Sequence, residues 1–205
     1  MYSLRSFRLF AIALPLLLLQ QLNVARAGSY TTHPTEPSPS TLSAPPPAPT
    51  HGKVISITDG DTLTVLCADG VPEKIRLVDI DAPEKTQPFG TAAKHFLSNL
   101  AYMHSVTISR RGHDRYGRTL ATVTVDDAAH SININEALLE AGYAWVYRGK
   151  AKEPTYFELE SSARSAHRGL WSDPSAIAPW DFRKAAKAHR QELRQTYSSA
   201  LPGQI

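Results

Sequence analysis

Three short segments of the sequence place charged side chains beside turn-forming residues. They are "DGDT" at 59–62, "RLVDIDAPE" at 76–84 and "RRGHDRYGR" at 110–118. Each has an ordinary structural explanation when taken alone, because Asp and Gly form turns and charged residues often end strands. Together the segments supply two kinds of group: carboxylates from Asp61, Asp81 and Glu84, and guanidinium groups from Arg76 and Arg118.

These groups have complementary chemistry. Carboxylate oxygens without nearby His or Cys ligands favour a hard divalent cation, Ca²⁺ or Mg²⁺, over zinc. Two guanidinium groups can bind a phosphate bidentately. A metal, a carboxylate that orients or deprotonates water and a pair of arginines are the parts needed to hydrolyse a phosphodiester bond. The sequence therefore favours metal-dependent phosphodiester hydrolysis, provided that the fold brings the three segments together.

The elements that must position these groups follow from the periodicity of the sequence. Alternation predicts strands over 53–57, 62–68 and 73–80, separated by turns. Helical spacing then predicts a helix over 90–105, followed by strands over 106–111 and 118–125 and by helices over 134–142 and 154–169. This order predicts a mainly β protein with helices (α+β), namely a five-stranded OB-type β-barrel with three packed α-helices.

Residues 1–27 have the pattern of a secretory signal peptide. Arg5 and Arg8 precede an apolar run over 9–19, and Ala25-Arg26-Ala27 forms a cleavage site. An uncleaved anchor is the alternative, but the apolar run is short for a membrane span. We expect export to the periplasm or medium, without stable membrane association after cleavage. Residues 28–50, rich in Pro, Ser and Thr, are expected to form a disordered linker.

Removal of residues 1–27 changes the charge balance. The sequence has 22 Lys and Arg against 19 Asp and Glu, and three of the arginines precede residue 28. The mature chain is therefore formally neutral, and its overall charge does not argue for a polyanionic partner. Locally, the tail 173–205 is basic, since residues 182–197 carry five Lys or Arg against one Glu. We expect a solvated, partly helical tail; a basic arm that follows nucleic acid is the alternative.

From Lys53 to about Trp171 the chain resembles the staphylococcal nuclease, or thermonuclease, family. The resemblance rests on "DGDT" at 59–62, "RLVDIDAPE" at 76–84, "DRYGR" at 114–118, "INEALLEAGYAWVY" at 134–147 and "GLW" at 169–171. It covers nearly all of 51–172, which we expect to be a thermonuclease-like domain. It implies an OB barrel with three helices and Ca²⁺-dependent hydrolysis of DNA and RNA. We expect a monomer that prefers single-stranded substrates.

The resemblance also implies roles for individual residues. Four positions correspond to Ca²⁺ ligands: Asp61, Asp81, Glu84 and, through its carbonyl, Ala82. Glu84 would in addition orient or deprotonate water, and Arg76 and Arg118 would bind and polarise the scissile phosphate. Four further positions would contact a neighbouring nucleotide or line its pocket, where stacking tolerates any base: Arg115, Tyr116, Trp145 and Tyr147. Ala82 and Trp145 depart from the best-known member, which has Thr and Tyr there.

Two other functions fit a barrel of this kind. One is a catalytically inactive module that binds nucleic acid, and the other is an OB domain that binds oligosaccharide or protein. The first is disfavoured because an inactive copy is expected to lose at least one of the charged residues that this chain keeps. The second leaves those charges unexplained. The single Cys67 cannot form an internal disulfide and is expected to be a small strand residue.

Overall fold

The computed structural model describes residues 48–126, 131–147, 149, 151 and 153–200. The predicted signal peptide and nearly all of the predicted linker lie outside these residues. Within the described part of the chain, no helix is both long enough and apolar enough to cross a membrane.

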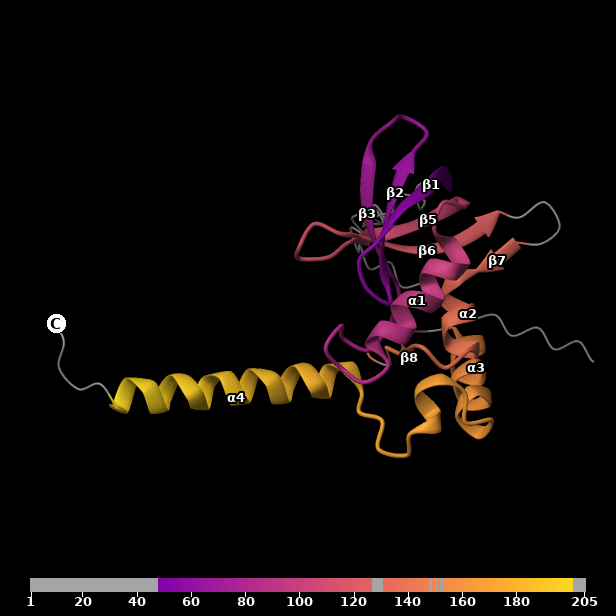
Figure 1. The fold of residues 1–205 in the computed structure, drawn as a ribbon. Helices are drawn as coiled ribbons and strands as arrows, with labels where there is room; N and C mark the ends of the chain where they lie inside the picture. The colour runs from indigo at the N-terminus through magenta and orange to yellow at the C-terminus, as the bar shows by residue number, and fades with distance from the viewer. Residues whose placement is uncertain (1–47, 127–130, 148, 150, 152, 201–205) are drawn as a thin grey trace, which may run out of the picture. The chain divides into compact units, whose positions relative to one another are not determined.

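The barrel is a closed sheet whose strands run in the order β3-β2-β1-β5-β6 (Figure 1). The strands are β1 (Thr50–Ile57), β2 (Thr62–Cys67), β3 (Pro72–Leu77), β5 (Ser105–His113) and β6 (Thr119–Asp126). A parallel pairing of β3 with β6 closes the sheet, and β7 (Ser131–Asn133) extends it beyond β6. Closure satisfies the backbone groups that an open edge would expose. The predicted OB-type barrel is confirmed.

The core follows from the alternation along these strands. Inward-facing residues such as Val54, Leu63, Ile75, Ile108 and Val123 are fully buried. Because neighbouring residues of a strand point to opposite faces, the polar residues between them reach solvent. Burial of this apolar surface is the main term that holds the barrel together.

Helices α1 (Gly90–Ala101), α2 (Ile134–Glu140) and α3 (Pro154–Ser165) complete the predicted domain. Helix α1 buries Ala93 and Leu97. It ends four residues earlier than predicted, because Met103 adopts a positive φ of 67° and Ser105 already belongs to β5. A 3₁₀ turn (Gly169–Ser172) and a long helix α4 (Pro179–Ala200) follow α3.

The third strand is shorter than the sequence predicts. It was expected over 73–80, but β3 ends at Leu77, and a turn at Val78 and Asp79 separates it from the short strand β4 (Ile80–Asp81). Asp79 adopts a left-handed conformation with φ 63°, which a strand cannot contain. Strand β4 then pairs with β8 (Trp145–Val146) instead of with the barrel. The break turns Asp81 out of the barrel sheet and sets it opposite Trp145.

Candidate active site

The first turn of the barrel brings Asp61 to the end of β4. Gly60 packs so closely that a Cβ atom there would lie 2.7 Å from the Cβ of Ala82 and 2.8 Å from that of Ala93. The glycine therefore permits an approach that a side chain would block. As a result, the backbone N–H of Ala82 donates a hydrogen bond to Oδ2 of Asp61 at 2.7 Å. Two segments far apart in sequence thus meet at one point.

Arg76 joins the two buried aspartates. Its Nη2 lies 3.0 Å from Oδ2 of Asp61 and 2.8 Å from Oδ1 of Asp81. Its Nη1 donates to the carbonyls of Leu77 and Ile80, at 2.7 and 3.0 Å. The side chain is therefore held from both sides. Its guanidinium lies directly between the two aspartates.

Burial gives the carboxyl group of Asp61 unusual protonation chemistry. Asp61 is 6% exposed and Asp81 2% exposed. Desolvation raises the pKa of Asp61 to about 7, although Arg76 opposes the rise and the charges of Asp59 and Asp81 add to it. Burial of the Asp61 carboxyl therefore outweighs the stabilisation of its charge by Arg76.

Glu84 lies at the rim of this cluster on a tightly folded loop. Its backbone N–H donates to Oε1 of Gln87 at 3.1 Å, and its carbonyl accepts from the N–H of Gln87 at 2.8 Å. Gly90 closes the loop, since a Cβ atom there would lie 1.9 Å from the carbonyl oxygen of Glu84. The buried Pro83 stiffens the corner before it. The Glu84 carboxylate is thereby presented half-exposed beside the buried pair.

Arg118 reaches the cluster through a hydroxyl group. Its Nη1 lies 3.3 Å from Oγ1 of Thr62, which in turn donates to Oδ1 of Asp61 at 3.2 Å. Asp114 orients the guanidinium from the other side by accepting from its Nε at 2.7 Å. Desolvation raises the pKa of Asp114, but the hydrogen bonds from Arg118 outweigh it and hold that pKa below its usual value. Thr62 and Asp114 had no role predicted from the sequence.

Arg115 and Tyr116 lie beside Arg118 on the loop between β5 and β6. The ring of Tyr116 is 70% exposed, and the guanidinium carbons of Arg115 and Arg118 lie 4.9 and 5.8 Å from its centroid. Cation–π contacts therefore hold this part of the loop together. An exposed aromatic face between two arginines is suited to a nucleotide, with its base and its phosphate contacted at once.

Trp145 lies on β8, the strand that pairs with β4, and Tyr147 follows it directly. Trp145 packs 4.3 Å from Trp171 between ring centroids, and the backbone N–H of Tyr147 donates to the carbonyl of Asp79 at 2.9 Å. Trp145 is thus partly buried in a small second core, whereas Tyr147 remains exposed. Asp79 itself pairs with Arg111 at 2.8 Å, at the break in the third strand.

Two residues of the C-terminal helix also belong to this surface. Arg183 contacts Asp81 and Glu84, with nitrogen–oxygen distances of 2.7 and 2.6 Å. The ring of Trp180 lies 5.8 Å from that of Trp145 and 6.2 Å from that of Tyr147. The sequence indicated that the tail is basic, but nothing in its local pattern identified these partners.

The donor set around Arg76 fits a hard divalent cation. The oxygens come from Asp61, Asp81, Glu84 and the carbonyl of Ala82, and Ca²⁺ prefers such ligands. Within the described residues, however, no three acidic, His or Cys side chains form a ready-made metal site. A cation does lie there, since the guanidinium of Arg183 contacts both Asp81 and Glu84.

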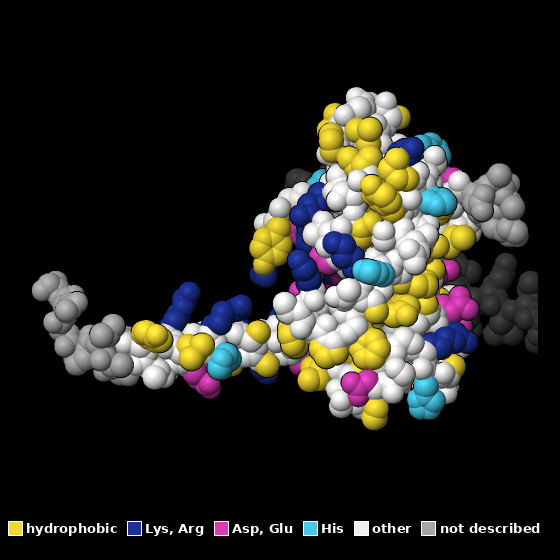
Figure 2. All heavy atoms as spheres, in the orientation of Figure 1, with side chains coloured by type: hydrophobic (Ala, Val, Ile, Leu, Met, Phe, Trp, Pro, Cys, Tyr) yellow, Lys and Arg dark blue, Asp and Glu magenta, His cyan; other side chains and the backbone are white. Residues whose placement is uncertain are grey.

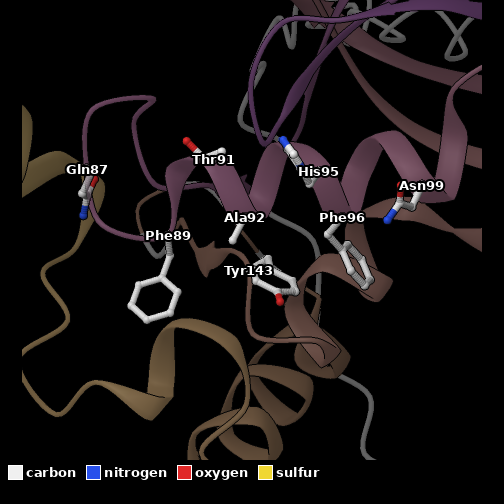
Figure 3. A pocket seen from close by; sticks show the side chains of 8 residues that line it. All are labelled: Gln87, Phe89, Thr91, Ala92, His95, Phe96, Asn99 and Tyr143. Atoms are coloured by element: carbon white, nitrogen blue, oxygen red, sulfur yellow. The ribbon is translucent and has the colours of Figure 1, made fainter.

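A pocket along α1 lies apart from these groups. Figure 3 shows that residues of α1 line it together with Gln87, Phe89 and Tyr143. None of the residues predicted to bind metal, phosphate or base contributes to it. The charged cluster is therefore at the strand ends and not in this pocket.

Comparisons with known proteins agree with the geometry. The family described as staphylococcal nuclease homologue matches residues 74–173. Protein ParB of Escherichia coli is 42% identical over 158 residues, covering 74% of this chain and 89% of that protein. Micrococcal nuclease of Shigella flexneri is 40% identical over 153 residues (71% and 87%), and an uncharacterized endonuclease of Haemophilus influenzae is 39% identical over 149 residues (73% and 82%).

Proposed function

Because the chain belongs to the staphylococcal nuclease homologue family and is a nuclease that hydrolyses phosphodiester bonds, we propose that it is an exported, Ca²⁺-dependent enzyme acting on both DNA and RNA. One observation carries the proposal. Asp61 and Asp81 are buried and share the guanidinium of Arg76, with Glu84 and Arg118 at the rim of the same cluster. Export rests on the sequence pattern of residues 1–27.

Each charged residue has a separate role in this proposal. Asp61, Asp81, Glu84 and the carbonyl of Ala82 would hold Ca²⁺, which when bound supplies positive charge that neutralises a phosphoryl oxygen. Glu84, the most accessible of the three carboxylates, orients or deprotonates the attacking water. The charges of Arg76 and Arg118 stabilise the negative charge that develops on the phosphate.

The residues around the charged cluster support a broad substrate class. Tyr116 and Tyr147 offer exposed aromatic side chains, Trp145 packs in the second core, and Arg115 offers a phosphate contact. Stacking does not distinguish one base from another, and phosphate is common to DNA and RNA. We therefore propose a sugar-nonspecific enzyme that prefers unpaired strands, whose bases are free to stack.

A direct assay tests this proposal. Purified mature protein is incubated with single-stranded DNA and with RNA, in Ca²⁺ and in EDTA, and acid-soluble nucleotides are measured. We expect release from both substrates in Ca²⁺, none in EDTA, and a loss of roughly 10²-fold or more in Glu84→Gln. Lys74→Gln, an exposed substitution on β3, is the matched control. Absence of release with any divalent cation would leave the inactive binding module as the function, and activity in EDTA would disprove the metal dependence.

A further inference from the structure

Helix α4 carries four of its five Lys and Arg residues on one face. Arg183, Lys187, Arg190 and Arg194 are spaced by four, three and four residues. At 3.6 residues per turn, these positions fall within about 60° around the helix, whereas Asp181 and Glu192 lie about 160° and 180° from Arg183. In Figure 2 most of the Lys and Arg atoms of α4 lie along one side and the acidic atoms along the opposite side. We call the four residues the basic stripe.

The stripe begins at the active site. Arg183, its first member, contacts Asp81 and Glu84. Two further contacts hold the start of α4 there: Trp180 packs against Trp145, and Nε2 of Gln87 donates to the carbonyl of Ile177 at 2.6 Å. The position of the stripe therefore does not depend on the Arg183 ion pairs alone.

Beyond Arg183 the stripe is open to solvent. Lys187, Arg190 and Arg194 are all exposed. At a rise of 1.5 Å per residue, Arg183 and Arg194 are about 17 Å apart along the helix. That length is enough to follow several consecutive phosphates of a strand.

We propose that the basic stripe of α4 binds the phosphates of a single nucleic-acid strand that continues from the active site. The inference rests on the proposed function, because continuity with the site is what selects a nucleic-acid strand as the partner. Each phosphate neutralised by Lys or Arg releases condensed counterions, which favours binding and makes it depend on salt. The stripe would thus lengthen the substrate site beyond the nucleotides that Tyr116 and Tyr147 contact.

The test measures binding without cleavage. Fluorescein-labelled oligothymidylates of 4 and 20 nucleotides are titrated in EDTA at several salt concentrations, with the full mature chain. The stripe variant is Lys187→Gln, Arg190→Gln and Arg194→Gln together. The matched control, Lys53→Gln, Lys74→Gln and Lys184→Gln, removes the same charge and includes one position on α4 outside the stripe. Circular dichroism confirms that both variants keep their helices.

We expect the stripe variant to bind the 20-mer about 10- to 100-fold more weakly near 0.1 M salt, with the slope of log K against log salt smaller by about 2. The 4-mer is expected to be affected less, and the control variant to resemble the wild type. Equal losses of affinity in the stripe and control variants would overturn the proposal. A loss of affinity that is the same for the 4-mer and the 20-mer would also overturn it. So would a stripe variant that binds both oligonucleotides normally but loses binding to phosphatidylglycerol vesicles, since that result assigns the stripe to a membrane. Because binding is measured without hydrolysis, failure of the stripe is distinct from failure of the nuclease assay.

Discussion

The guanidinium of Arg183 bridges the carboxylates of Asp81 and Glu84. Its Nη2 lies 2.7 Å from Oδ2 of Asp81, and its Nη1 lies 2.6 Å from Oε1 of Glu84. Burial lowers the pKa of Arg183, but these hydrogen bonds outweigh it and keep the pKa above its usual value. A permanent cation from the C-terminal helix thus lies on two carboxylates that we assign to Ca²⁺.

Arg183→Gln is therefore expected to strengthen Ca²⁺ binding. A divalent cation must displace the guanidinium from Asp81 and Glu84 before it can bind there. Removal of such a charge-assisted pair changes the free energy of Ca²⁺ binding by about 1 kcal/mol, or roughly 5-fold in affinity. Isothermal titration calorimetry of the purified protein measures the change directly. Arg190→Gln, on the same helix but away from the carboxylates, is the control. An unchanged or lower affinity in Arg183→Gln would show that the two cations do not compete.

Arg118→Ala is expected to lower kcat by roughly 10²-fold or more without unfolding the protein, because a donor to the developing charge is lost. Asp114→Asn keeps Arg118 but weakens the bond that orients it through Nε. We expect about a tenfold loss from this positioning change, with a smaller effect on KM than on kcat. Steady-state kinetics on single-stranded DNA and circular dichroism check both variants. Full activity in Arg118→Ala would remove that residue from the catalytic set.

Gly60→Ala tests the contact that brings Asp61 to Ala82. An added Cβ atom would lie 2.7 Å from that of Ala82 and 2.8 Å from that of Ala93, so the turn has to move. We expect a loss of about 1–3 kcal/mol in the free energy of unfolding and weaker Ca²⁺ binding. Gly149→Ala is the matched control, since no atom lies within 4 Å of a Cβ placed there. Denaturant melts and calorimetry measure the two effects; normal stability in Gly60→Ala would mean that the turn adapts.

Glu73 supplies a prediction on pH that does not involve the active site. Hydrogen bonds from Arg110 lower the pKa of Glu73 to about 2, against the desolvation that raises it, and Thr119 adds a further bond. A carboxyl with a depressed pKa in the folded state stabilises the protein above its unfolded pKa, and this contribution is lost as pH falls toward 2. Glu73→Gln should therefore lower the free energy of unfolding by about 1–3 kcal/mol at pH 7.

The difference in the free energy of unfolding between wild type and Glu73→Gln is expected to stay constant from pH 7 to about 4.5 and to shrink at lower pH. Urea melts at pH 7, 4.5 and 3 measure it. A difference that persists unchanged at pH 3 would indicate that lost packing, and not the charge of Glu73, causes the destabilisation.

The sequence by itself determined the barrel, the three helices of the predicted domain and five members of the charged cluster, namely Asp61, Arg76, Asp81, Glu84 and Arg118. Alternation of apolar residues such as Leu63 and Val65 defines which face of a strand is buried, and this information is local. The grouping of Asp61 with Asp81 could be inferred because strand ends of one small barrel converge. Thr62 and Asp114 were present in the recognised segments, but their hydrogen bonds to Asp61 and Arg118 depend on side-chain positions that spacing does not specify.

Only the tertiary structure decided the break at Asp79 and the partners of α4. The left-handed Asp79 is held by Arg111 and by the N–H of Tyr147, neither of which is near it in sequence. Arg183 meets Asp81 across 102 residues of chain. Local patterning identifies a basic segment, but the carboxylates that a basic side chain meets depend on which elements pack together. That packing is defined only when the chain has folded.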